Sequence, residues 1–276
     1  MTGANGWASA VPQDGPDMPL VPFDASRPNV ARAYDYLLGG KTNFAPDREL
    51  ADKLVDIYPG TRQMVWENRR FLIRALDYVL AQAISQYVDL GAGLPTSPAV
   101  HERVRRHDST ADVVYVDNDP VVINHLWAMT TKGDDHIEAI AGDVAKPAAV
   151  LDAVQATGLI DLHEPACLIL GMVLHFLDAG TAREVTAGYV SELAPGSHVI
   201  ITVACGEPAI GQQITRTYDA APVHNHTPED VASFFTGLNL ITPGIADARA
   251  WTPGWLTPAP FLERSGQVLA GVGVKP

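Results

Sequence analysis

The sequence has few cysteines and no long apolar run. Only Cys167 and Cys205 occur in 276 residues, and both lie in apolar segments typical of buried strands, so we expect reduced core thiols and no disulfide. No segment approaches the roughly 18 to 20 consecutive apolar residues of a membrane-spanning helix. The first residues also lack the basic and then apolar pattern of a secretory signal. These absences predict a soluble protein of the cytoplasm.

Basic residues are scarce as well. The chain has 19 Lys and Arg against 32 Asp and Glu, which gives a formal net charge of −13. A negative surface repels phosphate backbones and anionic lipids, so we expect neither nucleic acid nor a membrane as a partner. A small-molecule substrate is compatible with this charge. The sequence predicts no particular oligomeric state.

The composition itself is that of a globular protein, because 47% of the residues are hydrophobic and 18% are charged. Residues 1–22 are rich in Gly, Pro, Asp and Asn without periodicity, which indicates a loose N-terminal tail. Helical patterns fill residues 23–85, and residues 86–276 alternate short apolar runs with helical patterns. We therefore expect one globular unit, in which a helical extension or lid precedes an α/β domain.

The apolar runs predict strands at about 86–90, 113–116, 137–141, 167–170 and 198–204, with two more near 238–242 and 267–274. Helical spacing predicts helices at 27–38 with Ser26 as the N-cap, 46–58, 63–85, 98–107 behind Ser97, 120–131, 148–155, 181–193 and 228–236 behind Thr227. This alternation is typical of βαβ units and a mostly parallel sheet.

The residues at the strand exits point to a ligand site. In open α/β sheets ligands bind beyond the carboxyl ends of the strands. The first strand leaves as Asp89-Leu90-Gly91-Ala92-Gly93, the second as Asp117-Asn118 and the third as Asp143-Val144. A glycine pair alone can be a tight turn, and an aspartate after a strand can be a helix N-cap. Three acidic exits in order along one sheet edge favour a binding site instead.

Charge indicates which nucleotide fits these exits. A dinucleotide brings a pyrophosphate, whereas S-adenosylmethionine carries a sulfonium, an ammonium and only one carboxylate. Asp89, Asp117 and Asp143 favour the second ligand. The loop also continues as Leu94-Pro95-Thr96 and so lacks the third glycine of dinucleotide-binding folds. A nicotinamide-dependent oxidoreductase is the weaker interpretation for these reasons.

The successive segments VDLGAGLPT, VVYVDNDP, AGDV and LILGMVLHFL resemble the motifs of class I S-adenosylmethionine-dependent methyltransferases. The segments ARAYDYLLGGKTNFAPDR, NRRFLIRAL, HTPEDVASFF and AGVGVKP are similar, more narrowly, to the actinobacterial S-adenosyl methyltransferase family, once catalogued as a domain of unknown function. This resemblance runs from about Arg27 to the C-terminus, names no acceptor, and leaves a non-catalytic binding or regulatory protein as the alternative function.

The resemblance implies a Rossmann-like fold with a seven-stranded sheet in the order 3-2-1-4-5-7-6 and an antiparallel last strand. It also implies how the cofactor is held. Asp89, Gly91, Ala92 and Gly93 would line the methionine moiety, Asp117 would hold the ribose, Asn118, Asp143 and Val144 would flank the adenine, and Gly171 at the fourth strand exit would complete the site.

The polar and aromatic stretch before residue 44 has two interpretations. It can close over the ligand as a lid, with Arg32 or Lys41 reaching the methionine carboxylate and Tyr36 shaping the acceptor pocket, and with Gly40 and Asn43 in the flexible end. It can also be a packed helix with a glycine cap. Asn68, Arg69 and Arg70 either face the cofactor or belong to a solvated helix face.

Histidines provide the remaining candidates. His175 follows the fourth strand and could act as a general base, although methyl transfer from an activated sulfonium depends mainly on positioning. His224 and His226 flank one asparagine, and a metal would need further ligands, so we expect no metal site.

Overall fold

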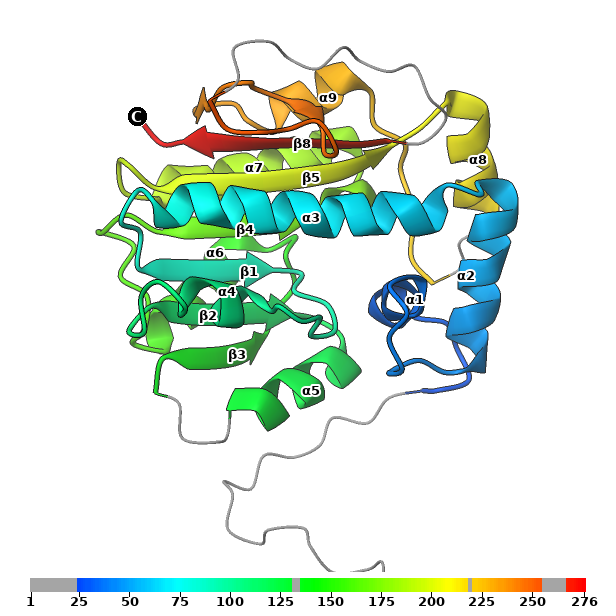
Figure 1. The fold of residues 1–276 in the computed structure, drawn as a ribbon, viewed down its shortest axis with the longest axis horizontal. Coiled ribbons are helices and arrows are strands. Elements are labelled where there is room, and N and C mark those ends of the chain that lie inside the picture. The colour runs from blue at the N-terminus through cyan, green and yellow to red at the C-terminus, as the bar shows by residue number, and fades with distance from the viewer. Residues whose placement is uncertain (1–23, 131–134, 218–219, 255–266) are drawn as a thin grey trace, which may run out of the picture.

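Figure 1 shows the fold in a computed structural model of the chain. The structure describes residues 24–130, 135–217, 220–254 and 267–276. The expected tail over residues 1–22 lies outside these ranges, as does residue 131 at the end of one expected helix. Within the described ranges, no helix combines the length and the apolar composition needed to cross a membrane.

A mostly parallel sheet lies at the centre. Strands β1 (Gln86–Leu90), β2 (Asp112–Asp117), β3 (Ile137–Ala141), β4 (Cys167–Gly171) and β5 (His198–Cys205) pair in parallel, and β8 (Gln267–Val274) runs antiparallel to β5 and to β6 (Asn239–Leu240). The order β3-β2-β1-β4-β5-β8-β6 confirms the implied topology, including the antiparallel last strand. A further two-residue strand, β7 (Ala246–Asp247), pairs with β8 and was not expected.

Helices cover both faces of the sheet. The first face carries α3 (Thr61–Leu80), α4 (Val100–Val104) and α5 (Pro120–Thr130), and the other carries α6 (Pro147–Ala156), α7 (Ala179–Glu192) and α9 (Pro228–Ser233). Neighbouring strand residues point to opposite faces, so Tyr87 packs in the first core and Val88 in the second. Cys167 and Cys205 are buried and free, as expected.

Three further helices lie beyond the carboxyl ends of the parallel strands: α1 (Val30–Leu37), α2 (Ala45–Ile57) and α8 (Pro208–Thr217). We call them the cap. Leu37, Leu50 and Leu54 belong to a small core of their own, against which Ile214 of α8 packs. The cap therefore forms a wall opposite the sheet edge at which ligands bind in such folds (Figure 1). The expected domain boundary after residue 85 stays a prediction, and α3 itself packs on the sheet.

Several predicted details were wrong. The N-cap of α1 is Asn29, whose Oδ1 accepts the Arg32 amide at 3.1 Å, whereas Ser26 donates to Asp24. The helix α4 begins after Ala99 rather than Ser97, because the Glu102 side chain accepts the Ala99 amide. Helix α3 ends five residues early, β6 is shorter than expected, and both α8 and the 3-10 turn η1 (Leu174–Phe176) were missed.

Candidate functional site

The carboxyl ends of β1 to β4 surround one end of a cavity of about 550 Å³, and the cap closes the other end. Pockets of roughly 300 to 1,000 Å³ are typical of small-molecule sites. Every residue expected to bind the cofactor lines this cavity, and so do Asn68, Arg69 and His175: the cofactor set is Asp89, Gly91, Ala92, Gly93, Asp117, Asn118, Asp143, Val144 and Gly171. The topology thus brings together side chains that are far apart in the sequence.

The glycine loop after β1 approaches the cavity with its backbone. Gly91 and Gly93 have φ angles of +73° and +65°, which L side chains rarely adopt. The amides of Gly91 and Ala92 both donate to the Val116 carbonyl, at 2.8 and 3.1 Å. A Cβ on Gly93 would meet no atom within 4 Å, so open space adjoins the loop there. The loop is therefore fixed by β2 and leaves room for a ligand against its backbone.

Asp117 at the end of β2 is buried and organises the loop. Its Oδ2 accepts the Gly93 amide and its Oδ1 accepts the Asp119 amide, both at 2.9 Å. Burial raises the pKa of this carboxyl, and the two amides oppose that rise. Each carboxylate oxygen can accept a second hydrogen bond, so Asp117 can still bind hydroxyl groups of a ligand.

Asp89 at the end of β1 lines the same cavity. Burial raises its pKa to about 7; the Arg69 guanidinium opposes this rise and the Asp117 carboxylate adds to it. A cation bound nearby would lower the pKa of such a carboxyl group, because a positive charge stabilises its ionised form.

Asp143 after β3 is more accessible. Its Oδ1 accepts the Ala145 amide at 3.0 Å, and its Oδ2 lies 3.4 Å from the Lys146 ammonium. Asn118 is exposed at the rim and Val144 is buried beside it in the cavity wall. One polar and one apolar side chain therefore stand at the mouth of the cavity.

Helix α3 contributes Asn68 and Arg69. Arg69 Nη2 donates to the carbonyls of Thr96, at 2.6 Å, and Pro98, which ties α3 to the glycine loop. Asn68 is buried and donates to the Tyr34 hydroxyl at 2.9 Å. Arg70 alone has the exposed, ion-paired position of a solvated helix face.

His175 is buried in η1 and lines the cavity. Burial, together with a smaller effect of the nearby His226, lowers its pKa to about 3. The imidazole is therefore neutral at physiological pH and weakly basic. His226 Nε2 lies 3.2 Å from the Leu174 carbonyl. Among the residues that the structure describes, no group of three or more His, Cys, Asp or Glu is placed to hold a metal ion.

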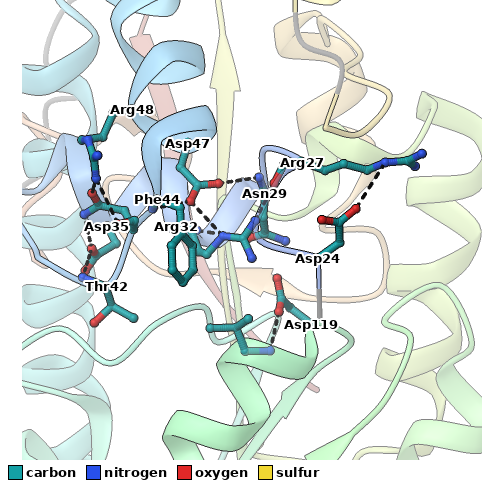
Figure 2. A network of polar contacts seen from close by, with 12 residues as sticks. Asp24, Arg27, Asn29, Arg32, Asp35, Thr42, Phe44, Asp47, Arg48 and Asp119 are labelled. Carbon is teal, nitrogen blue, oxygen red and sulfur yellow. Dashed lines mark hydrogen bonds and ion pairs between the residues drawn. The ribbon is translucent and has the colours of Figure 1, made fainter. Parts of the chain in front are cut away.

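Within the stretch expected to form a lid, Tyr34 and Asp35 line the cavity, whereas five other members do not: Arg32, Tyr36, Gly40, Lys41 and Asn43. Arg32 is the clearest correction: its Nε lies 2.9 Å from Asp47 Oδ2, with both side chains almost completely buried, so it cannot reach the carboxylate of a ligand (Figure 2). The other members lie as follows: Tyr36 faces the Arg62 guanidinium, Lys41 is exposed, and Gly40 and Asn43 pack around the Asp35 carboxylate.

Sequence reasoning missed part of the cavity wall. Leu54 of α2 and Ile214 of α8 line it, and so does Asp119 just before α5. Ile210 and Ile214 are four residues apart, which is a helical signal, but Gly211 between them hides it. Met172 also lines the cavity and has a φ of +57°, a conformation that residue type does not reveal.

Comparison with known proteins identifies the family. A family model described as S-adenosyl methyltransferase matches residues 18–276. A Thermobifida fusca protein whose crystal structure is assigned as a methyltransferase is 34% identical, with 91% of this chain and 96% of that chain covered and a TM-score of 0.80. A DUF574 family protein from Streptomyces avermitilis is 29% identical, with 92% and 99% covered and a TM-score of 0.81.

The comparison with curated proteins gives no match. The family match spans nearly the whole chain, and the two similar structures share its fold over almost their full length. The chain therefore belongs to the S-adenosyl methyltransferase family and is an S-adenosylmethionine-dependent methyltransferase.

Proposed function

We propose that the cavity between the sheet edge and the cap is the methyl-transfer site, with S-adenosylmethionine at the sheet edge. Asp117 would bind the ribose hydroxyls, Asn118, Asp143 and Val144 would flank the adenine, and the glycine loop and Asp89 would line the methionine part. The observation that carries this proposal is that three strand-exit carboxylates and a positive-φ glycine loop converge on one cavity.

The donor groups of the cavity fit the charges of this cofactor. Asp89, which would line the methionine part, can face its sulfonium and ammonium groups. Arg69 can face its carboxylate: its Nε is buried and has no hydrogen-bond partner among the described residues. An unpaired buried donor costs about 1 to 3 kcal/mol, so a partner supplied by a ligand would remove an existing cost.

The bound cofactor supplies a methyl group that is already activated by the sulfonium. The residues of the chain then have to position the acceptor and keep water away. The cap and η1 enclose the cavity and can do both. His175 lies in this wall, and its low pKa makes a role in shaping the pocket a better account than strong general-base catalysis.

We further propose that the acceptor is a small molecule and that the protein acts in the cytoplasm without binding nucleic acid. The cavity supports a small-molecule acceptor, and the net charge of −13 supports the absence of nucleic-acid binding. The two buried free thiols support a cytoplasmic location.

Calorimetric titration with S-adenosylmethionine, S-adenosylhomocysteine and NAD tests the cofactor site. We expect both adenosyl ligands to bind and to raise the melting temperature by mass action, while NAD does neither. Binding of NAD without either adenosyl ligand would refute the proposal.

A further inference from the structure

The cavity continues from the sheet edge into a chamber whose walls are largely apolar. Six side chains define this acceptor chamber: Leu37, Leu54, Val65, Phe176, Ile210 and Ile214. They come from α1, α2, α3, η1 and α8, and Leu37, Leu54, Val65 and Ile214 also pack in or against the core of the cap. The chamber is thus a fixed part of the fold and not a gap between loops.

Hydrogen-bonding groups form the minor part of the cavity wall, and Tyr34, Asn68 and His175 are among them. The Tyr34 hydroxyl donates to the Val65 carbonyl at 3.2 Å and accepts from Asn68 Nδ2 at 2.9 Å. Asn68 is 2% exposed, and its Oδ1 has no hydrogen-bond partner in the described part of the chain. His175 Nδ1, also at the cavity wall, is buried without a partner as well. A ligand in the cavity can provide partners for unpaired buried polar atoms of this kind.

Positive charge is scarcer still. Among the described residues that line the whole cavity, Arg69 is the only Lys or Arg, and it is anchored to the glycine loop. The Asp35 and Asp89 carboxylates lie in the same wall. An anion in the chamber would lose its hydration without gaining a cation, and it would face carboxylates.

We propose that the acceptor chamber binds an uncharged, largely apolar small molecule with one hydrogen-bonding head group, and that it excludes carboxylates and phosphates. This inference rests on the proposed function, since it takes the sheet edge to be occupied by the cofactor. The polar head of the acceptor would lie at the Asn68 and His175 end of the chamber. Its apolar body would pack against α2 and α8. The neutral state of His175 is consistent with a head group that is also neutral.

A matched set of fragments tests the proposal in the full chain saturated with S-adenosylhomocysteine. Aromatic alcohols and amines, such as naphthol and naphthylamine, are compared with the carboxylate and phosphate of the same ring systems by thermal shift and calorimetry. We expect neutral members to bind at least about tenfold more tightly than their anionic counterparts. Equal or tighter binding of the anions overturns the proposal, and so does failure of every neutral member.

Variants at Ile214, with one control at Gln213, locate the bound fragments. Ile214→Arg puts a charge into the chamber and should weaken the neutral fragments by at least about tenfold while leaving the affinity for S-adenosylhomocysteine unchanged. Gln213→Arg, one residue away on the exposed side of α8, is the control and should change neither. If Ile214→Arg does not fold, Ile214→Thr should still weaken the fragments about threefold. If the affinity for the fragments is unchanged in both Ile214 variants, the fragments do not bind in the acceptor chamber and the proposal is contradicted.

The two proposals fail in different ways. Loss of S-adenosylhomocysteine binding in the unmodified protein would refute the proposed cofactor site. Normal binding of that ligand together with tight binding of anionic fragments would refute only the acceptor chamber.

Discussion

Asp89→Asn should stabilise the empty protein at alkaline pH and have a much smaller effect at acidic pH. Burial raises the pKa of Asp89 to about 7, so the folded protein holds the proton more tightly than the unfolded chain does. For a group whose folded pKa is raised, stability is greatest below the unfolded pKa and falls as the pH rises toward the folded pKa. Asparagine does not ionise in this pH range, so the free energy of unfolding of Asp89→Asn should not show this decline.

The size of the effect follows from the two pKa values. With about 4 in the unfolded chain and about 7 in the folded protein, wild type should lose about 2 to 3 kcal/mol between about pH 5 and about pH 8 through this group alone. The advantage of Asp89→Asn over wild type should grow by that amount across the same interval.

Urea unfolding of both proteins at the two pH values measures this difference. Asp152→Asn, an exposed position on α6, is the control and should differ from wild type by no more than about 0.5 kcal/mol at either pH. The reasoning would be refuted if the free energies of unfolding of Asp89→Asn and wild type differed by the same amount at both pH values. That result would show that Asp89 is ionised in the folded protein at both.

Three further outcomes are expected. Asp47→Ala should cost about 3 to 5 kcal/mol in urea unfolding, because it leaves the buried Arg32 guanidinium without its carboxylate; a cost below about 1 kcal/mol would contradict the ion-pair account. The NMR signals of the His175 ring should not titrate between about pH 5 and about pH 8, and a midpoint near 6.5 would show that the ring is solvated. Amide hydrogen exchange across residues 34–43 should slow on addition of S-adenosylhomocysteine, because the cap closes on the cofactor. Equal exchange rates with and without the ligand would show that α1 only packs against its neighbours.

The central sheet could be predicted from sequence because its strands are buried on both faces. The runs of β4 and β5 are mostly apolar, and the residues that follow the parallel strands mark the sheet edge. The same signal brought the residues proposed to bind the cofactor to one cavity, since parallel strands place their exits together.

The cap could be predicted only in part, because its partners are distant in sequence. Nothing before the structure shows that Arg32 faces Asp47 rather than a ligand, since both residue types are usually exposed. The α8 helix has only Ile210 and Ile214 as large apolar residues. That Ile214 packs against the core of the cap, which includes α2, can be seen only in the structure. The acceptor chamber depends on both elements and was therefore missed.

The affinity of Asp117→Ala for S-adenosylhomocysteine, measured by calorimetry, tests the central claim most directly. The account predicts a loss of about 2 to 3 kcal/mol in a folded protein, because charge-assisted hydrogen bonds to the ribose disappear. Asp112→Ala, at the opposite end of the same strand, should bind as wild type does. Unchanged affinity in a folded Asp117→Ala protein, or an equal loss in Asp112→Ala, would contradict a cofactor site at this edge of the sheet.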